Sequence, residues 1–178
     1  MSFITKLNTS VVLTRIYSQV HPDDDSVLSV ITFAIGPLGV EHGTALRPPS
    51  ALSHNTLAEP IVRYNTVLVV GHTNCGGAAA TLKAVIDGAP PPPQPLARWL
   101  EPLTALVGTL DLANVPESER MTKIVEASVR AQVANVVNSQ PVQAAWAGGR
   151  KNLWVHGLVY ELEAGILKDL NVTRGPPT

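Results

Sequence analysis

Runs of apolar, β-branched residues along this chain alternate with longer segments whose apolar residues recur every three or four positions. The first pattern predicts buried strands, and the second predicts amphipathic helices. Strands are expected at residues 10–17, 27–35, 66–70, 153–161 and 166–170. Helices are expected at residues 55–64, 81–86, 96–110, 116–137 and 142–147.

Turn and cap signals separate these elements. Pro22 presets the backbone of a turn, and the three aspartates at 23–25 are placed to cap the element that follows. A hairpin-like turn is expected at 163–165, and residues 171–178 are expected to fray. Four consecutive prolines at 90–93 predict a surface loop, with a docking site for a proline-reading partner as the alternative.

The alternation of strands and helices indicates an α/β fold with a mainly parallel central sheet flanked by helices. A chain of 178 residues is long enough to bury a full core. We therefore expect a single domain over residues 1–178.

Composition narrows the class of partner. The formal net charge is −1, without the basic excess of a nucleic-acid-binding protein. No apolar run approaches the ~20 residues that span a bilayer, so no membrane partner is expected. The only cysteine is Cys75, which leaves no intrachain disulfide, so we expect a reducing, cytoplasmic setting.

The rest of the chain is organised around residues 65–80, N-T-V-L-V-V-G-H-T-N-C-G-G-A-A-A. Open α/β sheets bind ligands at the carboxyl ends of their strands, and His72 and Cys75 follow the strand at 66–70 directly. An imidazole and a thiol on one loop can hold a metal or act together in catalysis. The structural alternative is a hydrogen-bonded histidine beside a buried cysteine.

This stretch resembles the second zinc-ligand motif of the β-class carbonic anhydrases. A second match lies downstream, at residues 126–135, 142–146 and 153–163, where the last segment contains V-H-G-x-x-Y. The resemblance covers residues 11–170. It implies a parallel sheet with one antiparallel edge, a zinc centre, and a homodimer or higher oligomer with active sites near the subunit interface. His156 of the closing strand is expected to be structural.

The first zinc motif of the family, C-x-D-x-R, is missing. Alignment on Val20-His-Pro22 places Arg15, Tyr17 and Gln19 at the cysteine, aspartate and arginine positions, and a one-residue slip places Ile16 at the cysteine. His72 and Cys75 are then two ligands where zinc needs at least three. No cofactor is expected unless a further ligand comes from His21, Asp23, Asp24, Asp25, His42 or His54.

The remaining groups suggest other chemistry. Arg15 could stabilise a Cys75 thiolate or bind a carboxylate substrate, and His72 could move a proton. Tyr17 and Gln19 could orient a carbonyl group. The backbone amides of Gly76 and Gly77 could stabilise developing negative charge.

Three functions are therefore weighed. The favoured one is an enzyme that acts without zinc on a small carbonyl or carboxylate compound by lyase, hydratase or hydrolase chemistry. The others are a zinc carbonic anhydrase with a rebuilt third ligand and a non-catalytic subunit or binding protein. The first is preferred because polar, hydrogen-bonding residues replace all three residues of the missing motif.

Overall fold

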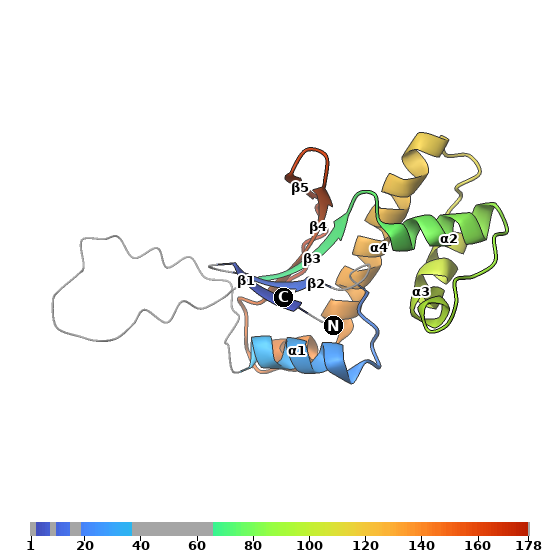
Figure 1. Ribbon diagram of the computed structural model, residues 1–178. Coiled ribbons are helices and arrows are strands. Elements are labelled where there is room, and N and C mark those ends of the chain that lie inside the picture. Colours follow the sequence, from blue (N-terminus) through green and yellow to red (C-terminus); the bar gives the residue numbers. More distant parts are fainter. Residues whose placement is uncertain (1–2, 8–9, 15–18, 37–65, 178) are drawn as a thin grey trace, which may run out of the picture.

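The computed structural model describes residues 3–7, 10–14, 19–36 and 66–177 (Figure 1). Its strands form one sheet in the order β1-β2-β3-β4-β5. Their bounds are Phe3–Leu7 for β1, Ser10–Thr14 for β2, Thr66–His72 for β3, Trp154–Glu161 for β4 and Ile166–Asp169 for β5. The helices are α1 (Asp25–Ile35), α2 (Gly76–Ile86), α3 (Leu96–Gly108), α4 (Glu117–Asn138) and α5 (Gln140–Ala147).

The centre of the sheet is parallel and both edges are antiparallel. Strand β3 pairs in parallel with β2 on one side and β4 on the other. The outer pairs, β1 with β2 and β4 with β5, run antiparallel. The α/β fold class is confirmed. The expectation of one antiparallel edge is wrong, because β1, which the sequence pattern did not predict, turns back along β2.

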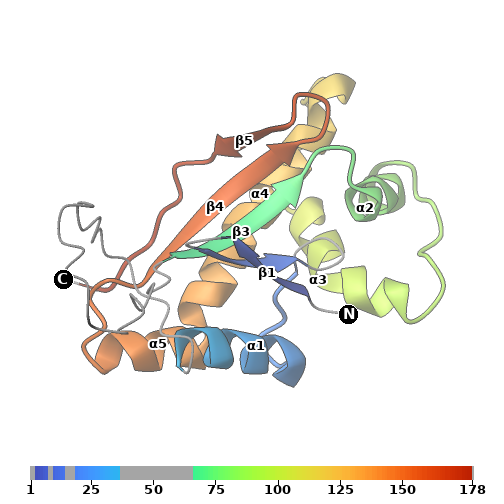
Figure 2. The same ribbon diagram turned by 60° about the vertical axis from the view of Figure 1, so that its left-hand side comes forward.

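Helix α4 packs along one face of β3 and β4 (Figure 2). Val67 and Val69 of β3 are buried, whereas their neighbours at 66, 68 and 70 are half-buried, as expected when one face of a strand meets a helix. A Cβ at Gly71 would lie 2.7 Å from Val129 Cγ2 of α4. Glycine at this position therefore permits the close approach of α4 to the end of β3.

The expected strand at 27–35 is wrong, because these residues form helix α1. Its buried residues, Val27, Ile31, Ala34 and Ile35, recur every three or four positions and line one helix face. The Asp24 side chain caps the helix by accepting hydrogen bonds from the Ser26 and Val27 backbone N–H groups at 2.9 and 3.4 Å. The predicted aspartate cap is thus confirmed, although it caps a helix instead of a strand.

The other expected helices within the described residues are present, with shifted ends. Helix α2 begins at Gly76, five residues before the predicted start, and α5 begins two residues before its predicted start. Helices α3 and α4 match their predictions to within two residues at each end. The helix expected at 55–64 and the end of the first predicted strand at 15–17 lie outside the described residues.

The C-terminal segment does not fray as predicted, because it packs on β4. Val155 and Arg174 exchange two backbone hydrogen bonds of 2.8 Å. His156 Nδ1 lies 2.9 Å from the Thr173 hydroxyl, which is a structural contact of the kind expected for this histidine. Val172 is buried, so residues 172–174 extend the packing of the sheet.

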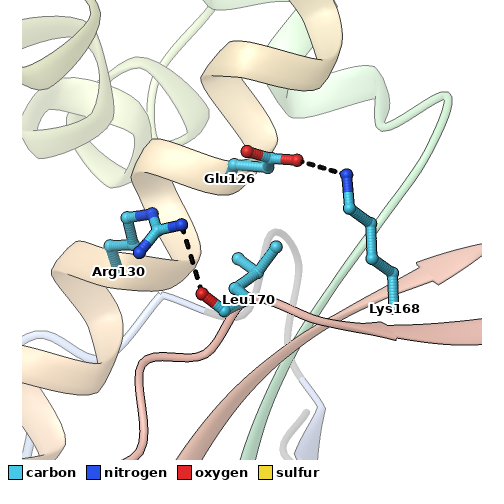
Figure 3. Close-up of polar contacts among 4 residues, drawn as sticks. All are labelled: Glu126, Arg130, Lys168 and Leu170. Atoms are coloured by element: carbon cyan, nitrogen blue, oxygen red, sulfur yellow. Dashed lines mark hydrogen bonds and ion pairs between the residues drawn. The ribbon is translucent and has the colours of Figure 1, made fainter.

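Strand β5 is an exposed edge strand held from one side by α4 (Figure 3). It follows the predicted hairpin turn, in which Gly165 has a φ of +68°. Lys168 Nζ donates to Glu126 Oε1 at 2.8 Å, and Arg130 Nη2 donates to the Leu170 carbonyl at 3.2 Å. These two contacts attach the hairpin to α4.

The proline run lies between α2 and α3, where Pro90, Pro91 and Pro93 are exposed. This placement agrees with a surface loop. None of the described helices has the length and apolar character required to cross a membrane.

Candidate functional site

The loop between β3 and α2 brings His72 and Cys75 to the carboxyl end of the central strand. His72 is the last residue of β3, and Cys75 is the N-cap residue of α2. Between them, Asn74 has a φ of +54°, in the left-handed region that asparagine tolerates better than most residues. The left-handed backbone at Asn74 lets the chain change direction between the end of β3 and the start of α2 within three residues.

The protonation of the His72 ring follows from its contact. Nδ1 lies 2.8 Å from the Thr73 carbonyl oxygen, which can only accept a hydrogen bond. Nδ1 must therefore carry a proton. In the neutral ring, Nε2 then has a lone pair, so it can accept a proton or bind a metal.

Cys75 is buried, with 5% of its surface exposed. Its carbonyl accepts the Ala79 N–H at 3.0 Å and so closes the first turn of α2. Among the described residues, its side chain forms no capping hydrogen bond. The backbone amides of Gly76 and Gly77 belong to the first turn of α2, where helix N–H groups lack intrahelical partners and favour negative charge.

Both side chains line one small cavity of about 10 Å³, close to the room that a single water molecule needs. Its other walls come from the end of β3 and from α4. The lining residues are Gly71, His72, Cys75, Val125, Ser128, Val129 and Gln132. The cavity therefore joins the predicted loop to polar residues of α4 that sequence reasoning missed.

Gln132 connects this cavity to the segment after β2. Its Oε1 accepts the Val20 N–H at 2.7 Å and the Asn135 side-chain amide at 3.1 Å. Asn135 also donates to the Val20 carbonyl at 3.0 Å. The sequence did hold a signal for Gln132, because this glutamine lies among the apolar residues of the predicted helix. A polar side chain buried there needs a hydrogen-bond partner.

The predicted site residue Gln19 is buried, with 1% of its surface exposed, beside the Val20 that Gln132 holds. Its Nε2 has no hydrogen-bond partner among the described residues. A buried donor left unsatisfied destabilises a fold by roughly 1–3 kcal/mol, so a water or ligand at this atom would be favourable. The other predicted residues of this segment, Arg15 and Tyr17, lie outside the described residues.

Glu163, in the turn after β4, clamps the His72–Cys75 loop from outside. Its Oε2 accepts the Thr73 hydroxyl at 2.9 Å, and its Oε1 accepts the Asn74 side-chain amide. The pKa of Glu163 lies below its ordinary value, chiefly because of its own backbone hydrogen bond and then because of those from Thr73 and Asn74. The Thr73 hydroxyl also accepts the Leu162 N–H at 2.9 Å, which completes the clamp.

The described residues do not complete a zinc site. They contain no group of three or more histidine, cysteine, aspartate or glutamate side chains placed to hold a metal. His21 stacks on Trp99 with ring centroids 4.3 Å apart, and Asp24 caps α1. Of the other ligand candidates, His42 and His54 lie outside the described residues. Within the described residues, His72 and Cys75 are the two candidate metal donors that share one cavity.

The fold and this loop match known proteins. A sequence profile described as carbonic anhydrase matches residues 52–167, roughly two thirds of the chain. A Coccomyxa β-carbonic anhydrase, solved with acetazolamide, superimposes with a TM-score of 0.65 at 25% identity, covering 87% of this chain and 58% of that one. This chain belongs to the β-carbonic anhydrase family.

Other β-carbonic anhydrase relatives agree. A carbonic anhydrase of Emericella nidulans is 29% identical over 84% of this chain and 53% of its own length. A tetrameric β-carbonic anhydrase of Sordaria macrospora has the same fold, with a TM-score of 0.65 at 24% identity over 89% of this chain and 66% of that one. The chain spans about half the length of the curated relatives it matches.

Proposed function

We propose that this chain is a divergent β-carbonic anhydrase-family enzyme that acts on a small carbonyl or carboxylate compound without a three-ligand zinc centre. Lyase, hydratase or hydrolase chemistry is the expected reaction type. One observation carries the proposal. The loop after β3 brings the only thiol of the sequence and an imidazole to a shared cavity, while the sequence holds no second cysteine.

The residues of this loop supply a nucleophile and a base. In the proposed reaction, Cys75 Sγ adds to the carbonyl carbon, and the thiol proton passes to His72 Nε2. The new S–C bond pushes the C=O electron pair onto oxygen. The amides of Gly76 and Gly77 at the start of α2 stabilise that negative charge.

The segment after β2 has the role of holding the substrate. Arg15 binds a carboxylate through two hydrogen bonds, and Tyr17 and Gln19 orient the carbonyl. The unpartnered, buried Nε2 of Gln19 supports this role, because a substrate oxygen would satisfy it.

A zinc carbonic anhydrase is the second candidate, because the chain belongs to a family of zinc enzymes and retains His72 and Cys75. It requires a further ligand, for which His42 and His54 are the histidines outside the described residues. Bound zinc would supply a water of lowered pKa, as in other zinc hydrolases and hydratases.

The zinc content separates the candidates. Protein purified without chelator or added metal is analysed by inductively coupled plasma mass spectrometry. Zinc near zero, together with turnover of a small carbonyl or carboxylate compound that depends on Cys75, supports the first candidate. Near one zinc per chain, with CO₂ hydration, supports the second. If the protein contains no zinc and shows no turnover, a non-catalytic subunit is favoured.

We also propose a homodimer or higher homo-oligomer in the cytoplasm. The tetrameric Sordaria relatives support self-association. So do the exposed apolar side chains of the β4–β5 hairpin, which include Tyr160, Leu162, Ile166 and Leu167. The single cysteine supports a reducing compartment.

A further inference from the structure

The side-chain amide of Gln132 has a fixed orientation. Its two contacts come from hydrogen-bond donors, the Val20 N–H and the Asn135 amide, so the atom that receives them must be the oxygen. The Asn135 amide is oriented in turn by the Val20 carbonyl, which accepts from it. The NH₂ group of Gln132 is therefore the part of this side chain left to bind something else.

The surroundings of Gln132 limit what its NH₂ group can bind. Gln132 is 6% exposed and lines the same cavity as His72 and Cys75. Both hydrogen bonds seen at the Gln132 side chain within the described residues go to its Oε1. The cavity has room for about one water-sized group. A ligand would thus place a single acceptor oxygen there and keep the rest of its atoms outside.

The chemistry of the donor sets the class of that oxygen. A carboxamide NH₂ is neutral at every physiological pH and cannot accept a hydrogen bond. It selects a carbonyl or carboxylate oxygen, and it discriminates against ligands that present a donor in this position. Ser128, one turn before Gln132, adds a hydroxyl to the same wall.

We infer that the Gln132 NH₂ group binds the acceptor oxygen of the substrate in the His72–Cys75 cavity and so is a substrate-binding residue that determines specificity. This inference rests on the proposed function, since it assigns the substrate oxygen of that reaction to a donor on α4. The same side chain holds Val20 through its oxygen. It therefore links substrate binding to the segment that carries Gln19.

The test uses the full chain labelled with ¹⁵N and acetate as the probe. ¹H–¹⁵N spectra are recorded during a sodium acetate titration, with sodium chloride at equal ionic strength as the reference. The Gln132 side-chain signals, identified by their absence from Gln132→Met, are expected to shift saturably with the same Kd as the Cys75 backbone amide. A titration with acetone tests a neutral carbonyl in the same way.

Two variants separate binding by the NH₂ group from the hydrogen bonds that hold Val20. Gln132→Met removes both the NH₂ donor and the bond to the Val20 N–H, and acetate affinity at the Cys75 amide is expected to fall about tenfold or more. Asn135→Ala removes the bond to the Val20 carbonyl but leaves the Gln132 donor, and it should keep acetate affinity within about threefold of wild type. Should the methionine variant fail to fold, Gln132→Glu, which keeps the acceptor for Val20, takes its place.

Several results would overturn the inference. These are no saturable shift at Cys75 with either probe, a shift at Cys75 without one at the Gln132 NH₂ group, or wild-type affinity in the Gln132 variants. Binding is measured here without turnover. A protein that binds acetate through Gln132 but turns over no carbonyl or carboxylate compound would therefore contradict the proposed function and leave this inference standing.

Discussion

Glu163 Oε2 accepts a hydrogen bond from the Thr73 hydroxyl at 2.9 Å, although 90 residues separate the two in the chain. The contact joins the β4–β5 turn to the loop that holds His72 and Cys75. Asn74, whose left-handed backbone gives that loop its shape, binds the second oxygen of the same carboxylate. One surface glutamate thus holds both central residues of the His-x-x-Cys loop.

The first prediction concerns pH. The pKa of Glu163 is lowered in the folded protein, so its ionised form stabilises the fold at pH values above its ordinary pKa of 4.5. That stabilisation should be lost as pH falls through the lowered pKa. We expect Glu163→Gln to unfold at a lower temperature than wild type at pH 7, and the difference should vanish in strong acid.

Thermal unfolding followed by circular dichroism at several pH values measures this effect. Amide hydrogen exchange at Asn74 and Cys75 should also be faster in Glu163→Gln. Glu101→Gln, at an exposed position of α3, is a control that removes the same charge without removing a contact to the His72–Cys75 loop. A pH-independent difference between Glu163→Gln and wild type would contradict the prediction.

The second prediction concerns the approach of α4 to β3. Gly71→Ala would place a Cβ 2.7 Å from Val129 Cγ2 and 3.1 Å from Val125 Cγ1, so part of the contact must move. We expect a loss of about 1–3 kcal/mol in the free energy of unfolding, measured by urea denaturation. Gly108→Ala has nothing within 4 Å of the new atom, and it should be neutral or slightly stabilising. Equal stabilities for the two variants would refute this packing.

The third prediction concerns the start of α1. Asp24→Ala removes the side chain that caps the first N–H groups of this helix, and it should lower the free energy of unfolding by about 0.5–2 kcal/mol. Asp23→Ala changes an exposed neighbour of the same charge and should stay within about 0.5 kcal/mol of wild type. Chemical denaturation compares the two. An Asp23 variant as unstable as the Asp24 variant would point to net charge instead of capping.

The fourth prediction concerns the proposed reaction. Cys75→Ala should abolish turnover of the carbonyl or carboxylate substrate, because it removes the nucleophile. His72→Ala should lower kcat about 10²- to 10⁴-fold, the usual contribution of a positioned acid or base. Circular dichroism spectra of both variants should match wild type. Full activity in either variant would remove its residue from the mechanism.

Local pattern was sufficient for most of the fold. The β-branched run at 66–70 became most of β3, with one face buried, and the spaced valines of 117–137 became the long α4. The same reasoning failed at 27–35, where β-branched residues favoured a strand. The Asp24 cap and burial of a single face outweigh that local preference, which is a weak one.

The sequence by itself determined the family and the presence of His72 and Cys75 at the end of a strand, because strand, loop and helix there are consecutive residues. Only the tertiary structure decided what surrounds them. Glu163 is 90 residues from Thr73, and Gln132 is 112 residues from Val20. Contacts between such distant residues arise when α4 packs on the sheet and β4 pairs with β3. They leave no periodic signal in the chain, since each depends on a partner that local sequence does not contain.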